Sequence, residues 1–175
     1  MLSREPYPVD EIDSRLLHEL QVDAKISLGA LGERVGLTAP AVMERVRKLE
    51  QAGVICGYHA QLDGRRLGLD ITAFVGVSVR DPALVSALER WAAGIASILE
   101  CHHVTGGFTL LLKAKVSNTG ALEALIHTLR SRDGVTGTET MVVFSTSVER
   151  STIPVEADEP ATSSRRRVRR RKTAE

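Results

Sequence analysis

Apolar side chains recur at helical spacing in the first part of the chain. In IDSRLLHEL they fall on one side of a helix, which we expect over residues 11–21. Acidic residues at its start suit the positive end of the helix dipole. Ser27 is a good N-cap for a second, short helix, and Gly36 is expected to end it, because glycine readily takes the left-handed conformation.

A third helix is predicted to begin at Thr38, after a turn of only two residues. In TAPAVMERVRKLEQ, Val42, Val46 and Leu49 form one apolar stripe, and the polar residues fall on the opposite face. Helix, short helix, tight turn and helix together predict a helix-turn-helix. After Gly53 the alternation in VICGYHAQL predicts a strand, one half of a small wing hairpin.

From residue 71 onward the pattern changes to strands and helices. ITAFVGVSV, SILECHHV, FTLLLKAKV and TGTETMVVFSTSV are typical of strands, and residues 82–96 and GALEALIHTLRSR of amphipathic helices. The order β-α-β-β-α-β predicts an α+β, ferredoxin-like domain. Its helices cover one face of the sheet. We assign Val75 and Val77 to the other face, which requires a cover, and a second subunit is the simplest one.

These patterns divide the chain into four segments. We expect a flexible N-terminus over residues 1–8, a winged helix-turn-helix over 9–64, a ferredoxin-like domain over 65–150 and a disordered basic tail over 151–175. Proline, serine, threonine and charged residues dominate the last segment, which has too little apolar surface to offset the entropy of ordering.

Charge is distributed unevenly over these segments. The formal charge is −3 for residues 1–64 (7 basic, 10 acidic), +1 for 65–150 (9 and 8) and +3 for 151–175 (7 and 4). All the basic residues of the last segment lie in RRRVRRRK. A general basic surface for nucleic acid is therefore missing from the first 150 residues, and any DNA-binding function depends on where individual charges lie.

Several classes of protein are disfavoured by the sequence. No apolar run approaches the ~18 residues of a membrane span, and the N-terminus lacks the pattern of a signal peptide, so we expect a cytoplasmic protein. The two cysteines lie 45 residues apart without a CxxC pair, which disfavours a structural metal or disulfide framework. Neighbouring His102 and His103 point to opposite faces of a strand and cannot share one ion. No catalytic set, cofactor or metal is predicted.

Three stretches of the sequence resemble a known family. IDSRLLHELQVDAKISLGALGERVGLTAPAVMERVRKLEQAGVICGYHAQLD resembles the N-terminal winged helix of the Lrp/AsnC (feast/famine) transcription regulators, and VTGGFTLLLKAKV and RDGVTGTETMVVF are similar to two landmarks of that family's ligand-sensing domain. The resemblance covers roughly residues 9–150. It implies a regulator that binds double-stranded DNA, dimerises through its C-terminal sheets, often forms octamers, and responds to amino acids or related metabolites.

The outward face of the third helix is the predicted DNA-binding surface; a merely solvated face is the alternative. Arg47 and Lys48 suit phosphates or guanine edges, and Glu44 suits a cytosine amine. Arg45, at the flank, and Thr38, at the helix start, suit backbone phosphates. A dimer would set two such helices ~34 Å apart, one duplex turn. The predicted DNA-binding residues are Ser27, Thr38, Pro40, Ala41, Glu44, Arg45, Arg47 and Lys48.

The loop of residues 104–109 occupies the family's ligand-binding position. Family members commonly have Gly-Asp-x-Asp where this chain has Gly106-Gly107-Phe108-Thr109, so both acidic positions are neutral. An unpaired, desolvated ammonium is costly, so we expect a weak response to zwitterionic amino acids and a better one to an uncharged or acidic metabolite. In the alternative, the loop only supports subunit packing. The predicted effector-binding residues are Val104, Thr105, Gly106, Gly107 and Thr109.

Two rival functions remain open. A ligand-independent architectural DNA-binding protein is favoured by the acid-free loop and by the basic tail, whose dense charge suits a sequence-independent DNA arm as well as a solvated disordered segment. An enzyme is the other rival, because siroheme decarboxylases resemble the same two-domain fold. Its candidate residues would be His59, His102 and His103, but no spacing supports them, and the basic outward face of the third helix favours the regulator.

Overall fold

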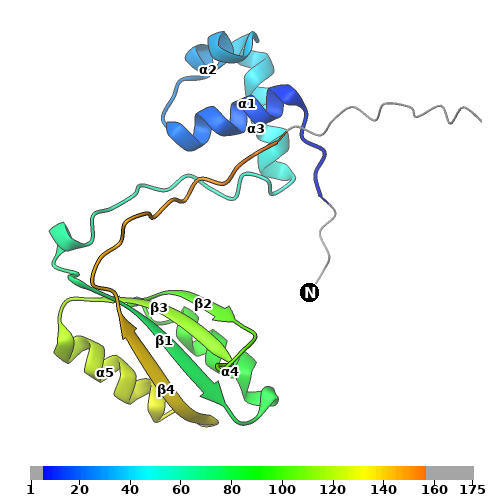
Figure 1. Cartoon of the computed structure of the whole chain (residues 1–175). Coiled ribbons are helices and arrows are strands. Elements are labelled where there is room, and N and C mark those ends of the chain that lie inside the picture. The colour runs from blue at the N-terminus through cyan, green and yellow to red at the C-terminus, as the bar shows by residue number, and fades with distance from the viewer. Residues whose placement is uncertain (1–5, 157–175) are drawn as a thin grey trace, which may run out of the picture. The chain divides into compact units, whose positions relative to one another are not determined.

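The computed structural model describes residues 6–156, which belong to two compact units (Figure 1). Residues up to His59 and from Arg150 onward form the first unit, and Ala60–Glu149 form the second. The first unit is helical and the second combines helices with a sheet, so each is described by itself. In residues 6–156 no helix has the length and apolarity to cross a membrane.

Three helices form the first unit, as predicted: α1 (Glu11–Val22), α2 (Leu28–Val35) and α3 (Ala39–Gln51). The Ser27 hydroxyl caps α2 by accepting the N–H of Ala30 at 3.2 Å, which confirms the predicted N-cap. Gly36 ends α2 in the left-handed conformation, with φ of 74°, also as predicted. The helices enclose a small apolar core made of Leu16, Leu31, Val35, Val42 and Val46.

The turn from α2 to α3 passes unusually close to Gly32. A Cβ atom on residue 32 would overlap the carbonyl oxygen of Leu37. The N–H of Leu37 donates in turn to the carbonyl of Gly32 at 2.9 Å, which holds the turn against the helix. Only glycine allows this contact, so Gly32 determines how closely the turn, and with it the start of α3, lies against α2.

The residues after α3 do not form the predicted strand, so the predicted wing hairpin is wrong for the described chain. Residues 54–62 contain no strand. The N–H groups of Val54 and Ile55 instead donate to the Leu49 carbonyl, at 2.9 and 3.2 Å, where they satisfy the end of α3. Ile55 also packs on the helical core. Ile55 therefore covers the helices, whereas Tyr58 and Leu62 of the same alternation stay exposed. A short 3-10 helix, η1 (Arg65–Leu67), follows.

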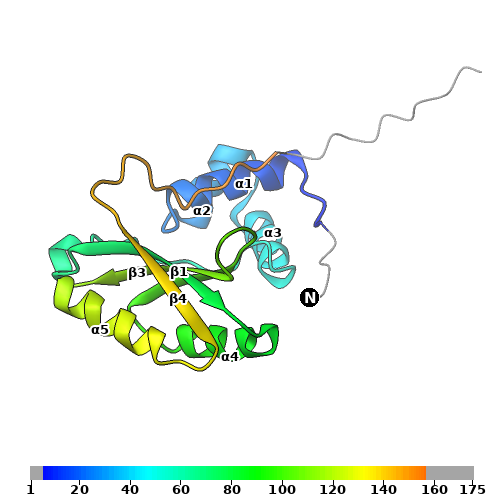
Figure 2. The same cartoon turned by 60° about the horizontal axis from the view of Figure 1, so that its bottom comes forward.

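The second unit confirms the predicted β-α-β-β-α-β order of a ferredoxin-like fold. All strand pairs are antiparallel, and the strand order in the sheet is β2-β3-β1-β4. Figure 2 shows both helices on the same side of the sheet. The elements are β1 (Ile71–Val79), α4 (Pro82–Ala93), β2 (Ile98–His103), β3 (Leu110–Val116), α5 (Thr119–Arg130) and β4 (Val135–Val142).

Val75 and Val77 lie under the helices, so their predicted place on the open face of the sheet is wrong. Their side chains are 1% and 0% exposed and belong to the core that includes Leu88 of α4. Alternation along β1 then directs Phe74 and Gly76 to the opposite face. The covered set is the wholly apolar one, whereas the set on the open face includes Thr72.

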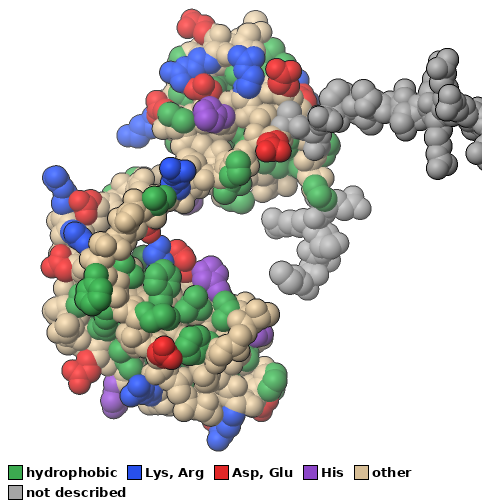
Figure 3. Space-filling model, in the orientation of Figure 1, with side chains coloured by type: hydrophobic (Ala, Val, Ile, Leu, Met, Phe, Trp, Pro, Cys, Tyr) green, Lys and Arg blue, Asp and Glu red, His purple; other side chains and the backbone are tan. Residues whose placement is uncertain are grey.

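The open face of the sheet carries apolar side chains without a cover from the helices. Phe74 pairs with Met141 of β4, and Gly76 pairs with Leu111 of β3, so these side chains share the face. The ring of Phe108 lies over Gly76, where a Cβ atom would come within 2.6 Å of it. Figure 3 shows hydrophobic side chains gathered on this side of the sheet.

The first residues of the predicted disordered tail are ordered on helix α1. Ser14 donates its hydroxyl to the carbonyl of Val155 at 2.9 Å, and the Gln21 side chain bonds both backbone groups of Ile153. The expectation of disorder is therefore wrong for residues 151–156. Side chains of α1 bond the backbone of this segment, and the composition of the segment itself does not reveal these partners. The rest of the tail, with RRRVRRRK, and residues 1–5 of the predicted flexible N-terminus lie outside the described residues.

We predict that Gly32→Ala destabilises the helix-turn-helix by about 1–3 kcal/mol, because the added methyl group must push the turn away. Urea unfolding at neutral pH measures the change. Gly29→Ala is the matched control on the same helix: its Cβ would meet nothing closer than 4.0 Å, so better helix propensity should leave stability unchanged or higher. Equal stability of the two variants would contradict the proposed close approach.

Candidate nucleic-acid interface and effector loop

Helix α3 separates a buried stripe from an exposed polar face. Val42 and Leu49 are fully buried and Val46 nearly so, which confirms the predicted packing face. Most residues of the predicted DNA-binding set lie on the exposed side of the helix. Ala41 and Arg45 are the half-buried members. The exposed members are Ser27, before α2, and Thr38, Pro40, Glu44, Arg47 and Lys48.

The start of α3 leaves its N-cap hydroxyl unused by the helix. Thr38 has the extended backbone of an N-cap, but its side chain makes no capping hydrogen bond. Thr38 is exposed, so its hydroxyl is available at the positive end of the helix dipole, where anions bind readily. Ser27, by contrast, uses one lone pair of its oxygen to cap α2 and keeps its hydroxyl proton and the other lone pair for another partner.

Charges on the exposed face of α3 are held weakly. Lys48 lies 3.6 Å from Glu44, and both side chains are more than half exposed. An exposed pair of this kind contributes ~0.3–0.5 kcal/mol, so a phosphate or base edge can replace it at little cost. Arg47 makes no ion pair with another residue in the range 6–156. The face thus offers one guanidinium and one ammonium to a ligand.

Arg45 is bound within the helical unit. Its guanidinium lies 2.7 Å from Asp10 and 2.8 Å from Asp13, and the Asp13 side chain is only 9% exposed. Hydrogen bonds to Asp10 and then Asp13 raise the pKa of Arg45 above its ordinary value. The pair of carboxylates joins α3 to the start of α1. Phosphate contact by Arg45 stays a prediction, and the guanidinium would have to leave both carboxylates to make it.

The base of the effector loop is pinned to strand β1. The N–H of Thr109 donates to the Val77 carbonyl at 2.8 Å, and the Thr109 hydroxyl accepts the N–H of Val79 at 3.1 Å. Within the loop, the N–H of Val104 donates to the Thr109 carbonyl at 3.1 Å. Thr109 therefore has a structural role, and its hydroxyl proton and second lone pair remain for a ligand.

The tip of the loop is open. Gly106 has φ of 112°, which favours glycine, and a Cβ atom on Gly106 or Gly107 would meet nothing within 4 Å. Thr105 is exposed beside them. The tip can thus present backbone N–H groups to a small molecule, as predicted from its glycines. Neither the tip nor the base carries a carboxylate.

The sheet supplies a carboxylate that sequence reasoning missed. Glu139 of β4 is exposed and pairs in register with Gly76 of β1. Directly paired residues point to the same face, and Phe108 of the effector loop covers Gly76 on that face. Glu139 therefore lies on the same side of the sheet as the loop. Strand register carries this relation, and no local signal in the sequence reveals it.

The histidines proposed for an enzyme do not converge in the sheet. His102 pairs with Leu111 on the open face and lies 3.1 Å from Glu100, whereas the next residue, His103, pairs with the buried Leu110. Among residues 6–156 no group of three or more His, Cys, Asp or Glu side chains is placed to hold a metal ion.

Each of the two units matches a known protein-family model. The model of the AsnC-type helix-turn-helix domain matches residues 9–50, and that of the Lrp/AsnC ligand binding domain matches residues 72–153. A helix-turn-helix followed by a ferredoxin-like ligand-binding domain defines a class of transcriptional regulators.

Known relatives cover most of the chain. It is 32% identical to the HTH-type transcriptional regulator FL11 of Pyrococcus horikoshii over 148 residues, 85% of this chain and 97% of the relative. It is 38% identical to the leucine-responsive regulatory protein of Escherichia coli K12 over 139 residues, 78% and 85% of the two chains. A Neisseria meningitidis transcriptional regulator solved with L-methionine has a TM-score of 0.80 and 26% identity, over 83% and 96% of the chains. The chain belongs to the Lrp/AsnC family.

We predict that Arg45→Gln destabilises the helical unit by roughly 1–3 kcal/mol at pH 7, because Asp13 loses its charged partner. Urea unfolding measures this. The adjacent Arg47→Gln, which removes no described ion pair, should change stability little. Equal destabilisation in both variants would contradict the structural role of Arg45.

The same variants should differ in their response to acid. Burial alone would raise the pKa of Asp10, but the Asp13 N–H and the Arg45 guanidinium outweigh it and hold the pKa below its usual 3.8. The contribution of Asp10 is thus fully present above pH ~4 and is lost as the pH falls through the lowered pKa. Stability measured from pH 6 down to pH 2 should fall less steeply in Arg45→Gln than in Arg47→Gln. Parallel curves would show that Asp10 does not depend on Arg45.

Proposed function

We propose that this transcriptional regulator binds operator DNA through the exposed face of α3. The observation that carries the proposal is the exposed Arg47 and Lys48 on a helix whose other side is fixed by a buried stripe. A guanidinium binds guanine O6 and N7 with two hydrogen bonds, and an ammonium suits a phosphate. The Thr38 hydroxyl and the helix start supply a phosphate contact that sets the register. The protein is not an enzyme, and it acts in the cytoplasm, where its DNA lies.

The effector is a small metabolite bound at the loop of residues 104–109. Backbone N–H groups at the glycine tip, with the Thr105 hydroxyl, suit a carboxylate or a neutral polar group. The Neisseria relative was solved with L-methionine, whose ammonium needs an anionic partner. This loop has none, so we expect an uncharged or acidic ligand. Glu100 and Glu139 are carboxylates on the same face of the sheet. Glu100 already pairs with Lys113, so Glu139 is the residue to test if an amino acid binds.

The regulator acts as a homodimer, with octamers as a further assembly. Support comes from the open face of the sheet, where Phe74, Leu111 and Met141 lie uncovered by α4 and α5. Apolar faces of this kind are stabilised by burial, and a two-fold axis allows the same face of two subunits to cover each other. Two recognition helices then read two half-sites of one operator.

We predict that Arg47→Ala weakens operator binding by ~1–3 kcal/mol, about 5- to 150-fold, if the guanidinium reads a base. A gel shift with the operator, identified by sequencing DNA bound to the purified protein, measures the change. Arg90→Ala is the matched control, an exposed arginine on α4 outside the helix-turn-helix. Unchanged affinity in Arg47→Ala would exclude this face of α3 from the interface.

We predict that the protein sediments as a dimer or larger at micromolar concentration, because stable interfaces of obligate dimers bury ~2,000 Å² or more. Leu111→Lys, which places a charge on the open face, should shift the protein toward the 19.0 kDa monomer. Leu67→Lys, at an exposed leucine of η1, is the control and should leave assembly unchanged. A wild-type monomer in sedimentation would refute the proposed dimer.

We predict that thermal-shift screening finds weak or no stabilisation by simple α-amino acids and stronger stabilisation by an uncharged or acidic metabolite. A ligand that binds only the native state adds RT ln(1 + [L]/Kd) to stability. Thr105→Ala should reduce this effect. Strong stabilisation by an amino acid, abolished in Glu139→Gln, would identify the missing ammonium partner and contradict the expected selectivity. No response to any ligand would favour the ligand-independent architectural role.

A further inference from the structure

Residues 151–156, which we name the C-terminal strap, are bound by polar side chains of α1. The carboxamide of Gln21 forms two hydrogen bonds with Ile153: its oxygen accepts the backbone N–H at 2.8 Å, and its nitrogen donates to the backbone carbonyl at 3.1 Å. Ser14 donates to the carbonyl of Val155 at 2.9 Å. A side-chain amide that bonds both groups of one residue recognises extended backbone in the way a neighbouring strand does.

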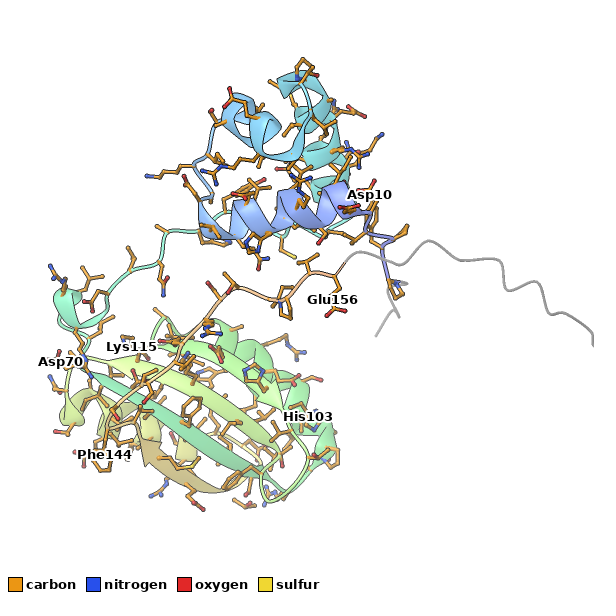
Figure 4. All side chains as sticks on the ribbon, turned by 45° about the horizontal axis from the view of Figure 1, so that its top comes forward. Asp10, Asp70, His103, Lys115, Phe144 and Glu156 are labelled. Carbon is orange, nitrogen blue, oxygen red and sulfur yellow. The ribbon has the colours of Figure 1, made fainter. Side chains whose placement is uncertain are left out.

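The geometry of the strap matches the spacing on α1. Ser14 and Gln21 are seven residues apart, two helical turns, or ~10 Å along the axis. Ile153 and Val155 span ~7 Å when extended, and they meet Gln21 and Ser14 in the reverse order, so the strap runs antiparallel to α1. Figure 4 shows the segment that ends at Glu156 beside this helix. Pro154 lies between the two contacts, where its missing N–H leaves no donor unsatisfied and its ring favours an extended Ile153.

Val155 gives the strap a partly buried anchor. Its side chain is half-buried and helps to line a recess of about 290 Å³ in the helical unit. The recess lies at the meeting point of α1, the end of α2 and the strap, and Glu19 and Arg34 form an ion pair within it. The remaining lining residues are Ser14, Arg15, His18 and Val35.

We infer that the C-terminal strap anchors the arginine-rich end of the chain to the DNA-binding unit, so that RRRVRRRK acts as a DNA arm of the helix-turn-helix. This inference rests on the proposed function. Residues 157–164, eight in number, separate the strap from Arg165. Eight residues reach at most ~30 Å, so the seven basic charges begin within that distance of α1 while the strap is bound.

Release of the strap would lengthen the tether. The preceding fixed point is then Glu149, which Lys113 of β3 holds at 2.6 Å, and fifteen residues, 150–164, separate it from Arg165. The effective concentration of a tethered group falls roughly as the −3/2 power of tether length, so lengthening from eight to fifteen residues lowers it about two- to threefold. The arm also then starts from the sheet unit, without attachment to the DNA-binding unit.

Hydrogen exchange in the full chain tests whether the strap is bound. The Ile153 N–H should exchange roughly two- to tenfold more slowly than expected for an unstructured peptide, the protection that one hydrogen bond provides. Gln21→Ala should abolish this protection, and Gln61→Ala, at an exposed glutamine of the linker, should leave it intact. An unprotected Ile153 in the wild type, or equal protection in Gln21→Ala, would overturn the inference.

DNA affinity tests the arm, through a cycle of four proteins: wild type, Gln21→Ala, a deletion of residues 165–172, and both changes together. The deletion should weaken duplex binding and flatten the slope of log affinity against log salt, by ~0.9 for each phosphate that the arm no longer neutralises. Gln21→Ala should weaken binding about two- to threefold in the full-length chain and not at all in the deletion. An equal effect in both backgrounds would mean that Gln21 acts without the arm and would overturn the inference.

If the full chain binds no DNA at any salt concentration, the proposed function fails as well. Normal DNA binding without coupling between Gln21 and the arm refutes the inference alone.

Discussion

The close contact between Gly32 and the turn that follows α2 is the constraint on which the DNA-binding unit depends. No Cβ atom fits between residue 32 and the Leu37 carbonyl, so α3 starts at one position against α2. The buried stripe of Val42 and Leu49 then fixes the rotation of α3 about its axis. The Gly32 contact and the buried stripe together make Arg47 face outward. Arg47 makes no described ion pair that would hold it there. Readout of a base requires this kind of fixed backbone, because a bidentate contact tolerates little displacement.

Two arginines near one another on α3 illustrate how burial separates structure from function. Arg45 lies at the edge of the helix interface and is held by two carboxylates of α1 and its N-cap, one of them nearly buried. Arg47 is exposed and free of described ion pairs. Removal of Arg45 leaves a buried charge uncompensated, whereas removal of Arg47 affects only what the helix binds. The same residue type thus stabilises the fold at one position and is available to DNA two residues later.

The chain connects its two units twice. The segment after α3 leads from the helical unit into β1, and the segment after β4 leads back to the strap on α1. The two units are therefore linked by two covalent routes. The returning route ends on the polar stripe of α1, on the helix whose first turn also holds Arg45 of α3.

Local sequence determined the helices, their caps and the succession of strands and helices along the chain, because these depend on neighbours within about four residues. Ser27 and Gly36 mark the ends of α2 through their own backbone and side-chain chemistry, and the stripe of α3 follows from spacing alone. The tip of the effector loop is likewise evident from its glycines. Each of these features holds whatever the rest of the chain does.

Tertiary structure alone decided the features that depend on residues far apart in the chain. Alternation in β1 favours the wholly apolar set that includes Val75 for a covered face, since the other set contains Thr72 and Ser78, but only the packed helices show which face they cover. The segment after α3 alternates like a strand, yet Ile55 finds its partner in the helical core. Glu139 reaches the side of the effector loop only through strand register, and Arg45 meets Asp10 and Asp13 only when α1 and α3 pack. The strap looks disordered by composition because its stability comes from Ser14 and Gln21, more than 130 residues earlier.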